Sequence, residues 1–140
     1  MNTGQNKIPI IEIDEGNFES EVLSWKQPVL VAFSAAWSRP CQILDAVLEE
    51  VATACAERVK VVKVNADNHP ELSFVWKIQS IPTLLYFVDG NLRARIVGTA
   101  SKEAILSKLR SVTAGRDSKT LNSDANNEMN TTTKDKEPQL

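Results

Sequence analysis

The stretch of sequence that decides the fold is residues 29–41, which read VLVAFSAAWSRPC. Residues 29–33 form a continuous apolar run, which is typical of a strand covered on both faces of a sheet. Ser38 is a preferred N-cap residue, and Pro40 falls in the first helical turn, where a missing N–H costs nothing. The stretch therefore predicts a central strand that leads directly into the N-terminus of a helix, the setting in which a thiol is most easily ionised.

The helix that follows is predicted to cover about residues 39–57. Its apolar stripe recurs every three or four residues and consists of Cys41, Leu44, Leu48, Val51 and Cys55. Residues 59–64 then alternate apolar side chains with two lysines and predict another strand. A strand, a helix and a strand at this spacing predict a parallel, right-handed crossover unit.

The rest of the chain predicts shorter elements around this unit. They are a first strand at 8–13, short helices near 17–25 and 69–77, an antiparallel hairpin of 81–88 and 92–97, and a final helix from Ser101. We therefore expect an N-terminal extension (1–7), one α/β domain (8–113) and a polar tail (114–140). Asn, Thr, Ser, Asp and Lys dominate the tail, so we predict that it is disordered and solvated. The alternative is that the tail is a docking segment.

Composition limits the classes of function. The chain has 140 residues, 42% of them hydrophobic and 24% charged, and a formal net charge of −2. This balance gives no reason to expect nucleic acid or a membrane as partner. The chain shows neither a signal peptide nor an apolar run that would span a bilayer, so a cytoplasmic location is expected. The lone histidine, His69, has no second ligand at metal spacing, so we expect no metal and no cofactor.

Three short motifs carry a resemblance to a known family. Residues 37–41 (WSRPC), 80–83 (SIPT) and 97–98 (VG) resemble the thioredoxin family in order, spacing and flanking strands. The resemblance implies a thioredoxin-like three-layer α/β/α sandwich with a mixed central sheet. By this analogy Ser38 stands where the attacking cysteine belongs, and Cys41 where the resolving cysteine belongs. A hydroxyl without an adjacent base is a poor nucleophile towards sulfur, so the resemblance implies that the fold is kept and the dithiol cycle is lost.

Other positions also depart from the family pattern. The buried acid that assists proton transfer in the family aligns with Ala32, and the Trp that commonly follows the strand's Phe aligns with Ser34. These two departures argue against a single engineered replacement at Ser38. Lys63 matches the family lysine beside that acid, so we expect it to extend to solvent or to find another carboxylate. Ala46 stands where the family helix carries a bending proline, so we expect a straighter helix.

The resemblance further implies a groove that binds an extended peptide beside a cis proline at position 82. The backbone before that proline pairs with the peptide as an added strand. The alternative is that the proline only turns the chain beside the motif. The expected binding residues are Trp37, Arg39, Pro40, Ile81, Pro82, Val97 and Gly98.

The two cysteines allow different predictions. Cys41 is either a single reactive thiol, which forms mixed disulfides with glutathione or a protein thiol, or an inert packing residue. Cys55 is interpreted as core. If one helix carries both, about 21 Å of helical rise separates them, whereas a disulfide bridges Cα atoms no more than about 7 Å apart. An internal disulfide is therefore excluded.

These observations favour a thioredoxin-like protein that binds a protein or peptide client and has at most a single-thiol role at Cys41. One alternative is a non-redox interaction module or holdase-type chaperone. A second is a residual protein-disulfide oxidoreductase of cell redox homeostasis that uses an external thiol.

Overall fold

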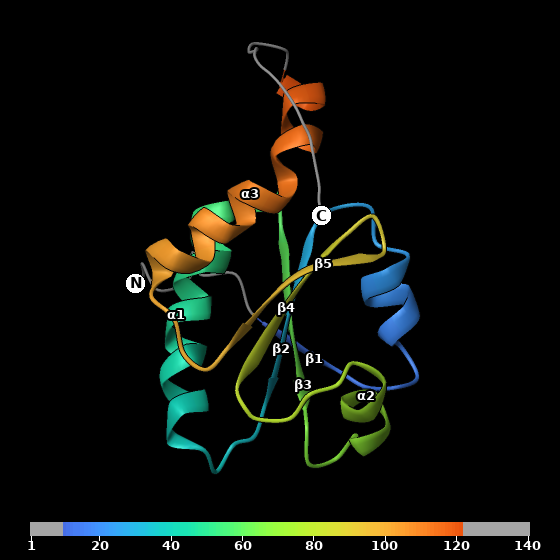
Figure 1. The fold of residues 1–140 in the computed structure, drawn as a ribbon, viewed down its shortest axis with the longest axis vertical. Coiled ribbons are helices and arrows are strands. Elements are labelled where there is room, and N and C mark those ends of the chain that lie inside the picture. The colour runs from blue at the N-terminus through green and yellow to red at the C-terminus, as the bar shows by residue number, and fades with distance from the viewer. Residues whose placement is uncertain (1–9, 122–140) are drawn as a thin grey trace, which may run out of the picture.

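The computed structural model describes residues 10–121 as three layers, with a five-stranded sheet between two sets of helices (Figure 1). The elements in chain order are β1 (Ile11–Ile13), η2 (Glu19–Leu23), β2 (Val29–Ser34), α1 (Arg39–Cys55), β3 (Lys60–Asn65), α2 (Pro70–Val75), β4 (Thr83–Val88), β5 (Asn91–Val97) and α3 (Lys102–Leu121). Helices α1 and α3 cover one face of the sheet, and η2 and α2 lie on the other. The predicted α/β/α sandwich is confirmed.

Strand β2 is the centre of the sheet, whose strand order is β1-β3-β2-β4-β5. All six residues of β2 are buried, as its apolar run predicts. β2 pairs in parallel with β3 and antiparallel with β4, so the sheet is mixed. The antiparallel register places Phe33 opposite Thr83. This register brings the residues after β2 and the residues before β4 to the same edge of the sheet.

Two apolar cores hold the layers together. On the α1 and α3 side, Leu48, Tyr86 and Ile105 are fully buried in one cluster. On the opposite side, the ring of Phe87 lies edge-on to that of Trp76, with 5.0 Å between the ring centroids. Burying large side chains on both faces of the sheet contributes most of the folding free energy. The edge of the sheet that carries the motif is therefore built on a rigid platform.

Replacement of Tyr86 by Phe should destabilise the protein at neutral pH by about 1–2 kcal/mol, because the fully buried phenol donates a hydrogen bond of 3.0 Å to the carbonyl oxygen of Ile105. Burial raises the pKa of the Tyr86 phenol above its ordinary value. The unfolded chain therefore loses this proton near pH 10 while the folded chain keeps it, and stability falls as pH rises beyond that point. Urea unfolding of both proteins from pH 7 to pH 11 tests this, and the stability difference should shrink above about pH 10.

The ends of several elements differ from the prediction. The first strand begins at Ile11, and residues 1–9, which include the expected extension, lie outside the described residues. The first short helix is a single π-helical turn, η2. Helix α3 continues to Leu121, past the predicted start of the tail at 114, because no proline interrupts it and a polar sequence can continue a helix that packing has already started. The remainder of the tail, 122–140, lies outside the described residues.

Among residues 10–121, none of the helices has both the length and the apolar character that a bilayer crossing requires.

Candidate functional site

The motif at residues 37–41 lies on the turn between β2 and α1. The turn is closed by the N–H of Ser38, which donates to the carbonyl oxygen of Ala35 at 3.1 Å. Ser38 has an extended backbone and caps α1, because its hydroxyl accepts a hydrogen bond of 3.3 Å from the N–H of Cys41. Ser38 is 5% exposed. The predicted N-cap is confirmed, and the serine hydroxyl is already used by the helix that it starts.

The two cysteines lie near opposite ends of α1. Both are free and buried, so the prediction that they do not bond to each other is confirmed. Cys41 is 1% exposed and Cys55 is 5% exposed. Burial raises the pKa of the Cys55 thiol, and the nearby Arg58 charge offsets part of that effect. Cys55 is therefore held in its unreactive thiol form, as its interpretation as a core residue implies.

The residues before β4 and after β5 lie on the other side of the motif. The Ile81–Pro82 peptide bond is cis. The N–H of Gly98 donates to the carbonyl oxygen of Pro82 at 2.8 Å, which fixes the end of β5 beside the start of β4. Pro82 is buried, whereas the Val97 side chain is 62% exposed. Four of the expected binding residues (Ile81, Pro82, Val97 and Gly98) thus come together.

The other three expected binding residues lie on the turn and the first turn of α1. The Trp37 side chain is 71% exposed, and Arg39 and Pro40 are exposed. The β2–β4 register places this turn at the same edge of the sheet as the Ile81–Pro82 bond. Trp37, Arg39 and Pro40 are thus accessible at this edge.

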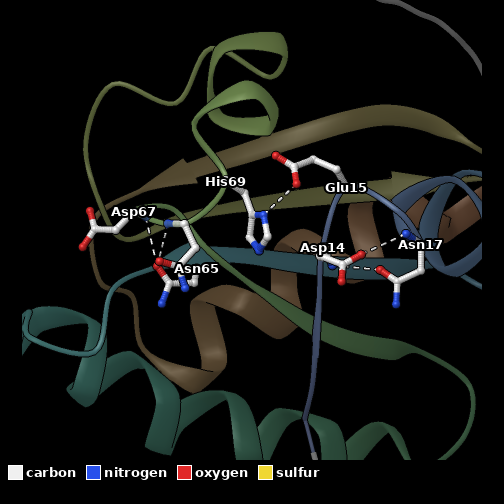
Figure 2. Close-up of polar contacts among 7 residues, drawn as sticks. Asp14, Glu15, Asn17, Asn65, Asp67 and His69 are labelled. Carbon is white, nitrogen blue, oxygen red and sulfur yellow. Dashed lines mark hydrogen bonds and ion pairs between the residues drawn. The ribbon is translucent and has the colours of Figure 1, made fainter.

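The sequence interpretation missed Asp67, which holds Trp37. The indole Nε1–H of Trp37 donates to the Asp67 carboxylate at 2.6 Å. Asp67 is itself held by Asn65, whose side-chain oxygen accepts from the backbone N–H of Asp67 at 3.0 Å, as Figure 2 shows. Asp67 follows the end of β3, which pairs with β2. Because β2 and β3 are parallel, the residues that follow them lie at the same edge of the sheet. This shared edge is the feature from which a contact between Trp37 and Asp67 could have been predicted.

Further polar contacts on the same side of the molecule involve His69 and the residues that follow β1. His69 Nδ1 lies 2.8 Å from a carboxylate oxygen of Glu15, and Asp14 and Asn17 bond each other's backbone N–H groups (Figure 2). The His69 side chain is 17% exposed. The His69 side chain is therefore half-buried, and Glu15 after β1 provides it with a partner that is distant in sequence.

Substitution of Asp67 by Ala should release the Trp37 indole. The hydrogen bond from Nε1–H is lost, while the fold keeps its cores, so we expect a loss of stability below about 1 kcal/mol for this exposed pair. The measurement is exchange of the indole N–H signals with solvent by NMR. The Trp37 signal should exchange faster, with Trp25 and Trp76 as internal controls. Unchanged exchange at Trp37 would contradict the contact.

The resemblance implies an acidic partner on β2 for Lys63, which lies on the neighbouring strand β3. Ala32 lies opposite Lys63 in the β2–β3 register and is fully buried, so it provides no charge. The Lys63 ammonium instead lies 3.2 Å from the carboxylate of Asp45 on α1. The expectation that Lys63 finds solvent or another carboxylate is confirmed, and Asp45 is the residue that the sequence interpretation did not identify.

Comparisons with known proteins agree with this arrangement. The family model described as thioredoxin matches residues 9–111. The thioredoxin of Mycobacterium bovis is 41% identical over 110 residues, which are 79% of this chain and 95% of that protein. The thioredoxin of Acidithiobacillus ferridurans is 40% identical over 102 residues, covering 73% of this chain and 94% of that protein. Thioredoxin 1 of Synechococcus elongatus is 39% identical over 97 residues, covering 69% and 91%.

The sheet, the capped helix, the cis proline and these matches over nearly the whole length of the relatives lead to one conclusion. The chain belongs to the thioredoxin family, whose chemistry is the exchange of thiols and disulfides.

Proposed function

We propose that this thioredoxin-family protein binds an extended segment of a protein partner beside Pro82 and has at most one reactive thiol, Cys41. One observation carries the proposal. The residue three positions before Cys41 is Ser38, whose hydroxyl is bound by the N–H of Cys41, and the other cysteine lies at the far end of α1. A complete dithiol cycle needs two neighbouring thiols, and among the described residues this site has one.

The expected chemistry is a single exchange step. The Cys41 thiolate attacks a disulfide of the partner or of oxidised glutathione, a mixed disulfide forms, and the other sulfur leaves as a thiolate. Ser38 cannot attack that mixed disulfide, because a hydroxyl is a poor nucleophile towards sulfur. Release of Cys41 therefore requires an external thiol, such as reduced glutathione or a protein thiol. The proposal places the protein in the reducing cytoplasm, in agreement with its two free cysteines.

Incubation of the folded protein with oxidised glutathione tests the thiol, with intact-mass measurement of the adduct. We expect one glutathione on the wild type and on Cys55→Ala, and none on Cys41→Ala. Cys55→Ala is the matched control because it removes the other cysteine of the same helix. An adduct that survives Cys41→Ala would overturn the assignment of the reactive thiol.

A non-redox interaction module of the holdase type is the second candidate, and the 1% exposure of Cys41 favours it. In this case binding depends on the exposed apolar side chains of Trp37 and Val97 and not on sulfur. The test is suppression of the aggregation of separated insulin B chains. Equal suppression by the wild type and Cys41→Ala, together with loss in Val97→Asp, supports this module. Loss in Cys41→Ala alone supports the thiol role.

A further inference from the structure

A pocket of about 220 Å3 lies at the carboxyl ends of the three parallel strands, below the first turns of α1. Its lining comes from β1, β2, the turn after β2, α1 and β3. The residues are Glu12, Ser34, Ala35, Ala36, Gln42, Asp45, Lys63 and Asn65. In open α/β sheets, ligands bind preferentially outside the carboxyl ends of the strands. The pocket is thus located where this architecture accommodates ligands, and it shares no residue with the expected groove.

Ser34 contributes a hydroxyl group to the lining of the pocket. It is the last residue of β2 and is 7% exposed, and it lines the pocket. Within residues 10–114, whose side chains are described, its hydroxyl has no hydrogen-bond partner, although its carbonyl oxygen accepts from the N–H of Ala66 at 2.8 Å. The hydroxyl is accessible from the pocket, since the fully enclosed side-chain polar atom without a partner among the described residues is Ser73 Oγ. A ligand donor that reaches the Ser34 hydroxyl oxygen would take the place of solvent there.

The charges that line the pocket do not cancel. Lys63 and Asp45 neutralise each other through their 3.2 Å ion pair. Glu12 lies opposite Lys63 in the β1–β3 register, and its carboxylate has no partner among the described residues. Gln42 donates its amide N–H to the carbonyl oxygen of Ala36 at 2.8 Å, which leaves the amide oxygen free to accept. The pocket therefore has a surplus of one negative charge and several free acceptor oxygens.

We propose that this pocket binds one organic cation, an alkylguanidinium or alkylammonium group, with the Glu12 carboxylate as its counter-ion. The Ser34 hydroxyl and the Gln42 amide oxygen accept its N–H groups. The volume of about 220 Å3 has room for several waters, which suits a guanidinium with a short alkyl stem. Anions are repelled by Glu12, and apolar ligands leave the charged lining without partners. The inference is independent of the proposed thiol chemistry.

The probe is ethylguanidinium chloride at millimolar concentration, with ethylurea as its neutral isostere. Binding is read from the NMR side-chain amide signals of Gln42 and Asn65. Saturable shifts with ethylguanidinium and none with ethylurea support the site. Absence of saturable shifts, or equal shifts with both probes, overturns it. All titrations use Cys41→Ala as well as the wild type, so that failure of the thiol proposal does not affect the result.

Three variants test whether the Glu12 carboxylate is the counter-ion of the bound cation. Glu12→Gln should weaken ethylguanidinium binding about twofold to fivefold, because the carboxylate of the exposed Glu12 is a solvent-screened counter-ion. Lys63→Met should strengthen binding, because it removes the competing cation and frees Asp45. Glu50→Gln is the matched control, since Glu50 is an exposed carboxylate of α1 outside the pocket, and it should leave the affinity unchanged. Equal affinity of Glu12→Gln and Glu50→Gln overturns the proposal.

The source of the cation is distinguished with two peptides of the same sequence, one containing arginine and the other its neutral analogue citrulline. If the arginine peptide shifts the Gln42 signal at lower concentration than ethylguanidinium does, the cation is a side chain of a docked partner. If only the free cation shifts the signal, the ligand is a small free amine or guanidine. Either result supports an organic cation site.

Discussion

Replacement of Ser38 by Cys is expected to turn the protein into a catalyst of insulin reduction by dithiothreitol, with a rate enhancement of roughly two orders of magnitude or more over the wild type. The substitution places a second thiol at the N-cap of α1, three residues before Cys41. Ser38 Oγ lies 3.3 Å from the backbone nitrogen of Cys41, so the new sulfur would lie at the first turn that carries the existing one. Two thiols in one turn complete the exchange cycle that one thiol cannot complete.

The control for this prediction is Ser38→Ala, which removes the hydroxyl without adding sulfur. It should cost about 1 kcal/mol of stability through loss of the cap, and it should not reduce insulin faster than the wild type. Intact mass after oxidation gives a second readout, because Ser38→Cys should lose two hydrogens as the new disulfide forms. Insulin reduction by the wild type at the rate of Ser38→Cys would contradict the single-thiol proposal.

Replacement of Gly90 by Ala is expected to lower the free energy of unfolding by about 2–4 kcal/mol, one of the largest single-residue effects in the chain. Gly90 has φ +80° in the turn between β4 and β5, a conformation that disfavours a side chain. An added Cβ would also lie 2.6 Å from the backbone oxygen of Leu23, so the hairpin and η2 would have to separate. Thermal unfolding followed by circular dichroism measures the effect.

Gly98→Ala is the matched control for the turn. Gly98 has a similar positive φ of +91°, but nothing lies within 4 Å of its added Cβ. It should therefore show only the backbone penalty of about 1–2 kcal/mol. A loss at Gly90 no greater than that at Gly98 would show that the approach to Leu23 does not matter.

Much of the fold could be predicted from the sequence because the deciding patterns are local. The apolar run of β2 and the serine cap of α1 each depend on neighbouring residues, and both were predicted where they occur. The end of α3 was not predicted correctly. Composition indicates where apolar side chains stop, but a helix can continue beyond that point without burying any. The π-helical form of η2 likewise leaves no distinct pattern in the sequence.

The candidate site was predicted only in part, for the same reason. The short motifs indicated Ser38, Cys41 and Pro82, since each lies in a recognisable stretch. The partner of Trp37 is Asp67, and all of α1 and β3 lies between them in the sequence. The partner of Lys63 is Asp45, which is separated from it by the rest of α1 and the first residues of β3. Such pairs can be predicted only when the sheet register is known. A single sequence therefore predicts that a lysine needs a carboxylate, but it does not predict which carboxylate.

The strand order has a consequence for synthesis of the chain on the ribosome. β1 and β2 do not pair with each other, and both pair with β3, while the remaining edge of β2 pairs with β4. The first two strands therefore emerge with no ladder to join until β3 has been made, and the long-range pairing of β2 with β4 comes later still. A nascent chain stalled before residue 60 should remain open to proteases and chaperones, and one released after residue 97 should already protect its central strand.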